Sequence, residues 1–131
     1  MELLIGFGTD NGKDLNNDHF GMAKYYHVYV FSDEKQEFIE QRKNVQFKAD
    51  KSIKHGDPDK AKATSSVLKG VDVLVGRKFG PNLKRLVRKF VCVVVRTNTI
   101  SDAIKIIGDN MDRIVEENSK GEDRKHIVLK P

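Results

Sequence analysis

Apolar runs alternate with amphipathic segments along this chain, and this alternation predicts an α/β fold. Residues 3–8, 71–75 and 91–95 are almost wholly apolar, which is typical of strands buried on both faces of a parallel sheet. Residues 25–31 alternate between two largely apolar faces, so we expect this strand to be covered twice. Residues 36–42 are polar around Phe38, which predicts an exposed hairpin strand at the sheet edge.

Three further segments have helical periodicity. Helix formers fill residues 59–69, and Gly70 ends this first helix. Pro81 stands in the first turn of a second helix. Thr99 and Asp102 give the third helix a capping-box-like start. The apolar stripes are Leu83, Leu86, Val87 and Phe90 in the second helix, and Ile100, Ala103, Ile104, Ile107, Met111, Ile114 and Val115 in the third. Residues 44–60 have no periodicity and are expected to form a long loop, which is typical of a lid, a binding segment or a disordered segment; as a lid it could close over a ligand.

The predicted element order is β-β-β-α-β-α-β-α. Right-handed crossovers would place the first, fourth and fifth strands parallel in the centre of a mixed five-stranded sheet, with helices on both faces. The fold class is therefore three-layer α/β/α. At 131 residues the chain fits a single domain, 1–131, with its core in residues 3–115. Residues 116–131 form a charged C-terminal arm in which 127–129 are apolar but have no predicted place.

Two loops that follow predicted strands define a candidate site. Ligands of α/β proteins bind where strands end and loops begin, so loops leaving neighbouring strands would share one crevice. The first loop offers His19, whose imidazole is a common ligand for iron and other transition metals. In the second loop, Gly80 and Pro81 open a helix whose first N–H groups suit an anion. Arg77 and Lys78 precede that helix and add positive charge.

These stretches carry a family resemblance. The order GFGTDNGKDLNNDHFGMAKYY, LKGVDVLVGRKFGPNLKRL, TNTISDAIKII resembles the dinitrogenase iron–molybdenum cofactor biosynthesis protein family over nearly all of residues 3–114. The resemblance implies a ribonuclease H-like fold and makes His19 a metal-cluster ligand. Family members commonly have a glycine-rich AGGxG turn where this chain has Val75, Gly76, Arg77, Lys78 and Phe79. This departure indicates a subfamily with its own ligand.

The resemblance also supplies a second metal-ligand candidate, His55, because many relatives carry a histidine- and glycine-rich loop there. The whole candidate set for cofactor binding is His19, Phe20, Gly21, Arg77, Lys78, Gly80, Pro81 and Asn82, with His19 and His55 as metal ligands.

Each candidate has a structural alternative. If His19 binds a metal, Asn17 and Asp18 could orient its second ring nitrogen. The structural alternative is that His19 is a loop histidine that caps a turn. Phe20 is more typical of core packing than of a ligand wall. Arg77 and Lys78 could simply be solvated. Cys92, which lies among valines, is expected to be a small core residue rather than a cluster ligand.

Composition narrows the class of protein. With 38% hydrophobic and 33% charged residues, the chain is typical of a globular protein, and its apolar runs are far shorter than the ~18 residues of a spanning helix. One cysteine and no signal-like N-terminus favour a cytoplasmic location, and no membrane association is expected. The net charge of +5 could attract nucleic acid, but charge of this size also occurs on ordinary proteins as solubility, so it does not favour a nucleic-acid partner.

The sequence favours a non-enzymatic carrier or assembly protein for an iron- or molybdenum-containing cluster, or a related anionic cofactor. Its partners would be metal-cluster donor and acceptor proteins, and it would be a monomer or weak dimer. The alternative is a basic nucleic-acid or protein-binding module without metal. A metal-dependent nuclease has little support, because the central strand, residues 3–8, carries none of the carboxylates that two metal ions require.

Overall fold

A computed structural model describes residues 2–45 and 58–131. Over these residues the chain forms one mixed sheet of six strands, in the order β3-β2-β1-β4-β5-β6. The strands are β1 (Leu3–Thr9), β2 (Tyr25–Phe31), β3 (Gln36–Lys43), β4 (Val73–Gly76), β5 (Val91–Val95) and β6 (Ile127–Leu129). The α-helices are α1 (Pro58–Val67), α2 (Leu83–Leu86), α3 (Ile100–Gly108) and α4 (Met111–Asn118), with 3-10 turns at η1 (Phe20–Met22), η2 (Gly80–Asn82) and η3 (Gly121–Asp123).

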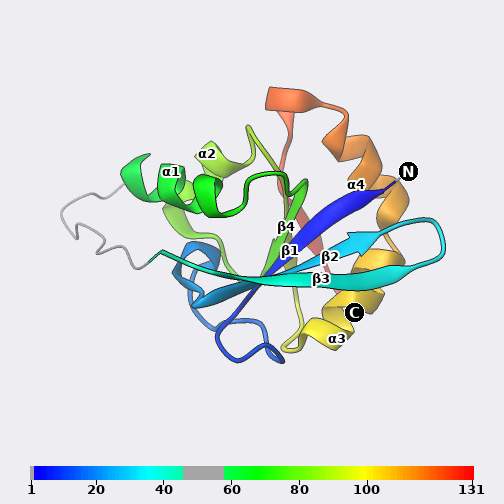
Figure 1. The fold of residues 1–131 in the computed structure, drawn as a ribbon. Coiled ribbons are helices and arrows are strands. Elements are labelled where there is room, and N and C mark those ends of the chain that lie inside the picture. The colour runs from blue at the N-terminus through cyan, green and yellow to red at the C-terminus, as the bar shows by residue number, and fades with distance from the viewer. Residues whose placement is uncertain (1, 46–57) are drawn as a thin grey trace.

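The α/β class and the parallel centre are confirmed. Strand β4 pairs in parallel with both β1 and β5, while β1 and β3 flank β2 antiparallel. Figure 1 shows α1 and α2 on one side of the sheet and α3 and α4 on the other. Two buried clusters match these layers: one contains Leu68, which follows α1, and Leu86 of α2, and the other contains Ile107 of α3 and Ile114 of α4. That the fold is ribonuclease H-like stays a prediction from the resemblance.

The prediction of five strands was wrong, because residues 127–129 form a sixth. Strand β6 pairs in parallel with β5 through Val93↔Ile127 and Val95↔Leu129. Ile127 and Leu129 are both buried. Three residues in a charged segment carry too little periodicity to reveal a strand. The C-terminal segment is therefore part of the sheet and extends the core beyond residue 115.

The long third helix expected from residue 100 to residue 115 is two helices. The break falls after Gly108, where the Asn110 side chain donates a hydrogen bond of 2.7 Å to the Ile106 carbonyl oxygen. Gly and Asn both have low helix propensity, and such side-chain bonds compete with the helix ladder. The predicted cap is confirmed: Thr99 Oγ1 accepts a hydrogen bond from the Asp102 amide at 3.1 Å.

The second predicted helix is also much shorter than expected. Residues 80–82 form a 3-10 turn, and α2 has four residues. Gly80 has a φ of +70°, which is outside the helical region and favours glycine. Partial charge at a helix start builds up from many aligned peptides, so this single turn gives only weak support to the predicted anion-binding helix start.

Strand β2 differs from expectation on its outer face. Tyr26 and Val28 are buried toward α1 and α2, but Tyr25, His27 and Tyr29 on the opposite face are only half-buried. Phe31 on that same face is fully buried in the cluster with α3 and α4, so the strand is covered on both faces at its Phe31 end and only partly on the outer face toward Tyr25. The edge position predicted for residues 36–42 is confirmed by β3, which ends the sheet.

Among the described residues, no helix has the length and apolarity needed to cross a membrane.

Candidate functional site

The first loop leaves β1 at Thr9 and is held by short-range hydrogen bonds. Thr9 Oγ1 donates to the Asp14 carbonyl oxygen and accepts from the Gly12 amide at 2.9 Å. Asn11 Oδ1 accepts from the amides of Lys13 and Asp14 at 2.9 and 2.8 Å. This is the Asx-turn chemistry typical of Asp, Asn and Gly in tight turns. The start of the loop is therefore a firm structure on which the rest is placed.

Asn16 fixes the backbone at His19. Its side chain is buried, with 3% exposed, and Nδ2 donates to the carbonyl oxygens of Asp18 and His19 at 3.1 and 3.0 Å. The His19 amide donates to Asp18 Oδ1 at 2.7 Å. Sequence reasoning missed Asn16, because an Asn-Asn pair in a polar loop looks like an ordinary turn.

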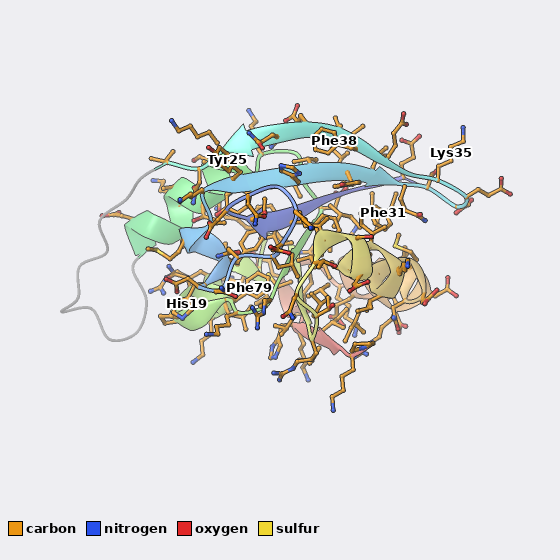
Figure 2. All side chains as sticks on the ribbon, turned by 90° about the horizontal axis from the view of Figure 1, so that it is seen from below. His19, Tyr25, Phe31, Lys35, Phe38 and Phe79 are labelled. Carbon is orange, nitrogen blue, oxygen red and sulfur yellow. The ribbon has the colours of Figure 1, made fainter. Side chains whose placement is uncertain are left out.

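The His19 imidazole packs directly on Gly80 of the second loop. A Cβ atom at Gly80 would lie 2.4 Å from His19 Nδ1, closer than any real contact, so a glycine is needed for this approach. The two loops are also joined by the Phe20 amide, which donates to the Lys78 carbonyl oxygen at 2.7 Å. Figure 2 shows His19 near Phe79, which precedes Gly80. The imidazole and the Gly80–Pro81 turn thus lie on the same side of the molecule.

Phe20 supports the loop from within the core. Its ring is fully buried and stacks between Tyr26 and Phe79, with centroid distances of 4.8 and 5.1 Å. Tyr26 donates its hydroxyl to the Phe20 carbonyl oxygen at 3.0 Å, and burial raises the pKa of this hydroxyl. Phe20 therefore has the packing role that sequence reasoning favoured, and its ring has no exposed surface for a ligand.

The polar neighbours of His19 do not orient its ring as expected. Asn17 Oδ1 instead accepts a hydrogen bond from Arg77 Nη1, and Asp18 bonds to the His19 backbone. Arg77 is thereby held against the first loop. This bond is a second tie between the loop after β1 and the loop after β4.

A polar hollow of about 390 Å³ opens against the first loop. Its wall includes Asp10, Asp14, Asn17, Arg77 and Asn98. His19, Gly80 and Pro81 are not on this wall. The two loops touch, but this hollow opens between the first loop, Arg77 and the turn after β5, and a crevice shared by His19 and the Gly80–Pro81 turn stays a prediction. The sequence did not single out Asn98. Its backbone is held at the hollow by a hydrogen bond of 2.8 Å, which its carbonyl oxygen accepts from the Leu15 amide.

The remaining candidates are placed as follows. Gly21 lies in η1 after Phe20, Lys78 is exposed, and Asn82 Oδ1 accepts a hydrogen bond from Arg85 at 3.3 Å. His55 and most of the loop 44–60 lie outside the described residues. Cys92 is fully buried, and burial raises the pKa of its thiol to about 12, so the expected core role is confirmed. Within residues 2–45 and 58–131, no three His, Cys, Asp or Glu side chains converge as metal ligands would.

Fold and site together define a three-layer α/β protein whose candidate site lies where β1 and β4 end. The particular family follows from comparison with known proteins. A family model described as dinitrogenase iron-molybdenum cofactor matches residues 1–110, and the chain belongs to this family.

A crystal structure of a Methanocaldococcus jannaschii protein described as a "putative dinitrogenase" has a similar fold. The TM-score is 0.57 at 15% sequence identity, and the match covers 84% of this chain and 91% of that one. At this identity the likeness concerns the fold alone. No curated protein matches the sequence.

Proposed function

We propose that this protein is a non-enzymatic carrier or assembly protein, and that its cargo is an iron- or molybdenum-containing cluster or a related anionic cofactor. Family membership supports a role in the biosynthesis or carriage of the iron–molybdenum cofactor. The observation that carries the proposal is the packing of the His19 imidazole on Gly80 beside Arg77 and Lys78. This packing supports the proposal because it brings a candidate metal ligand next to a loop that carries cationic groups.

His19 has one ring nitrogen available for a metal. The ring is half-buried, and the atoms nearest Gly80 are Nδ1, Cε1 and Cγ. Nε2 is on the other side of the imidazole, so it is the nitrogen that would coordinate. The bonds from Asn16 and Asp18 already hold the backbone of His19, which limits the entropy lost when a ligand binds.

Arg77 and Lys78 would hold the negative charge of the cargo. The Arg77 guanidinium is partly exposed and fixed by Asn17, whereas Lys78 is exposed. Hydrogen bonds from charged donors to anions are stronger than neutral ones. A ligand that touches His19 Nε2 and Arg77 would thus gain one metal bond and one charge-assisted contact.

The ligand set favours carriage of a preformed cluster over construction of one. Protein-built iron–sulfur clusters are held by several Cys thiolates, but this sequence has one cysteine, and Cys92 is buried with a raised pKa. A preformed cofactor brings its own sulfide ligands. One imidazole and nearby positive charge are then sufficient to hold it.

The proposal is tested by substituting His19→Ala and incubating the protein with isolated iron–molybdenum cofactor without oxygen. Iron and molybdenum content and the visible spectrum would be measured after gel filtration. Loss of a metal ligand should weaken retention by at least about tenfold. His126→Ala is the matched control, because His126 is exposed next to β6, and it should retain the wild-type metal content. Equal retention by both variants would remove His19 as a ligand.

A further inference from the structure

The outer face of the β2–β3 hairpin carries four aromatic rings. Tyr25, His27 and Tyr29 come from β2, and Phe38 comes from β3. Phe38 is 48% exposed, and its ring centroid lies 5.1 Å from His27 and 5.4 Å from Tyr29. Figure 2 shows Tyr25 and Phe38 on this hairpin. The other three rings are half-buried, so Phe38 is the most exposed ring of the four; an exposed aromatic ring is uncommon, because its burial is favourable.

A β-bulge keeps carboxylates off this face. The register shifts between Val28 and Tyr29, so that Val28 pairs with Glu40 and Tyr29 with Phe38. Ile39 is the extra residue. As a result, Glu40 shares the inner face with buried Val28, as Glu37 does through its pairing with Val30. Bulges redirect side chains in this way.

Without the bulge, strict alternation would place Glu37 on the same face as Gln41 and Lys43. With it, the described outer face of β3 consists of Gln36, Phe38, Gln41 and Lys43. The bulge therefore separates an acidic inner face from an outer face that has aromatic, amide and cationic groups.

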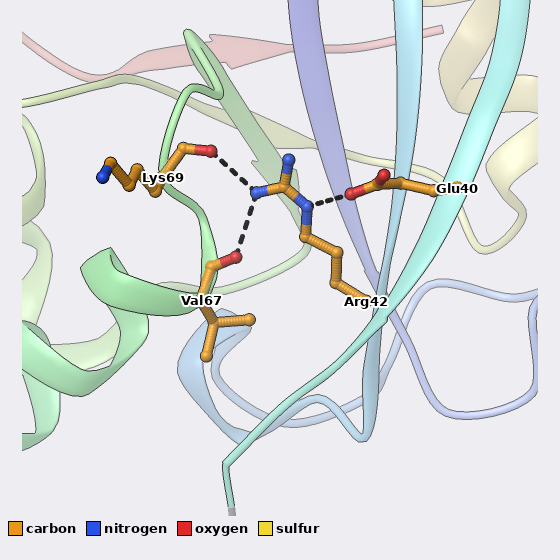
Figure 3. A network of polar contacts seen from close by, with 4 residues as sticks. All are labelled: Glu40, Arg42, Val67 and Lys69. Atoms are coloured by element: carbon orange, nitrogen blue, oxygen red, sulfur yellow. Dashed lines mark hydrogen bonds and ion pairs between the residues drawn. The ribbon is translucent and has the colours of Figure 1, made fainter.

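Arg42 holds one of these carboxylates on the inner face. Its Nη1 donates to the carbonyl oxygens of Val67 and Lys69 at 3.0 and 2.8 Å, and its Nε donates to Glu40 (Figure 3). These bonds tie the inner face of β3 to the end of α1. The negative charge of Glu40 is thereby compensated away from the aromatic rings.

Positive charge is found at one end of the aromatic row. Lys43 pairs across the strands with Tyr25 and is exposed. Lys24 precedes Tyr25 and is also exposed, and its amide donates to the Asp10 carboxylate at 2.9 Å, so two ammonium groups and one carboxylate lie at this end. Between this end and Phe38, His27 Nε2 lies 2.9 Å from Gln41 Oε1. A ligand on this face would meet the exposed ring of Phe38, the half-buried rings of Tyr25, His27 and Tyr29, and ammonium groups at one end.

We propose that this aromatic face, made by Tyr25, His27, Tyr29 and Phe38 with Lys24 and Lys43, binds single-stranded nucleic acid. A base stacks on the exposed Phe38 ring beside the half-buried rings, and phosphates lie near the two lysines, which is the combination that single-strand binding uses. A duplex fits less well because its bases are already stacked on one another. The inference goes beyond the proposed carrier function and does not involve His19.

The test is fluorescence anisotropy with a labelled twelve-nucleotide oligo(dT) and the same oligonucleotide annealed to its complement. We expect the single strand to bind more tightly than the duplex. Phe38→Ala should weaken single-strand binding at least fivefold, and Phe38→Leu should weaken it as well, whereas Phe38→Trp should retain it. Lys43→Gln should reduce the slope of log affinity against log salt concentration by about 0.7, as expected for one lost phosphate contact on a single strand.

Val128→Ala is the matched control, since Val128 is an exposed apolar residue, 37% accessible, on the strand at the opposite sheet edge. It should bind the oligonucleotide like the wild type. Three results would overturn the proposal: no binding at low salt, equal affinity for duplex and single strand, or binding that Phe38→Ala leaves unchanged. Self-association that Phe38→Ala abolishes, without oligonucleotide binding, would also overturn it and would assign the face to a second copy.

Discussion

Gly80 is the residue at which backbone conformation and the candidate site depend on each other. Its φ of +70° disfavours any residue with a Cβ, and that atom would also overlap the His19 ring. We expect Gly80→Ala to lower the free energy of unfolding by about 2–4 kcal/mol, from backbone strain and steric overlap together. Chemical denaturation would measure this change, and cofactor retention should fall with it because His19 must move.

Gly121→Ala separates the two causes. Gly121 also has a positive φ, +61°, but an added Cβ would meet no atom within 4 Å. This variant should lose only the conformational part, about 1–2 kcal/mol, and keep its cofactor. An equal loss of stability in both variants would show that the contact between His19 and Gly80 has no energetic weight.

Glu117 predicts a pH dependence of stability. Burial alone would raise its pKa, but hydrogen bonds from the Lys125 amide at 3.0 Å and from Lys120 Nζ at 3.1 Å, together with the positive charge of both lysines, lower it. Because the carboxyl pKa is lower in the folded state than in the unfolded state, the Glu117 carboxylate stabilises the folded protein at pH values above the unfolded pKa, about 4.3. This stabilisation is lost as the pH falls through the folded value.

Glu117→Gln should therefore lower the free energy of unfolding by about 1–2 kcal/mol at pH 7. The difference in unfolding free energy between this variant and the wild type should disappear as the pH falls from about 4.3 through the lowered pKa of Glu117. Urea titrations at a series of pH values would measure it. A gap that stays constant down to pH 2 would show that the carboxylate charge is not its cause.

At the scale of elements, β6 makes the C-terminal segment a structural part of the sheet. Ile127 is 1% exposed and packs in the cluster with α3 and α4. We expect Ile127→Ala to cost about 2–5 kcal/mol of unfolding free energy, and Val128→Ala on the same strand to cost well under 1 kcal/mol because Val128 is exposed. Thermal and urea unfolding would compare the two. Similar costs would mean that β6 does not hold the core together.

The sequence predicts some elements better than others for identifiable reasons. The bounds of β2 and β5 agree with the predicted ranges, and the Thr99 cap is found, because apolar alternation and capping chemistry are local signals. The break after Gly108 was missed because Ile107 and Ile114 keep one buried face across it. Strand β6 was missed because its pairing with β5 is not local.

The candidate site follows the same rule. Turn residues and the His19 loop could be predicted from their chemistry, and so could the nearness of the two loops from the strand order. The support from Asn16 and the length of α2 could not, since both depend on three-dimensional packing. The hollow beside Arg77 involves Asn98 from a third loop, which no spacing within one motif would indicate.

At the scale of the whole molecule, the carrier proposal and a nuclease differ in what they require of the carboxylates in residues 2–45 and 58–131. Asp10 accepts a hydrogen bond from the Lys24 amide and Asp72 from the Leu4 amide, both at 2.9 Å, so each has a structural partner. Two-metal catalysis requires carboxylates that converge. We expect no hydrolysis of a labelled oligonucleotide with magnesium or manganese, assayed by gel electrophoresis. Cleavage that Asp10→Asn abolishes would contradict the carrier account.

The central claim is that His19 coordinates the cargo, and the most direct test observes its ring. The side-chain imidazole signals of ¹⁵N-labelled protein would be recorded by NMR during anaerobic titration with isolated iron–molybdenum cofactor. The account predicts that the His19 signals broaden or shift first, while those of His27 and His126 remain. Unchanged His19 signals at full cofactor binding would contradict it.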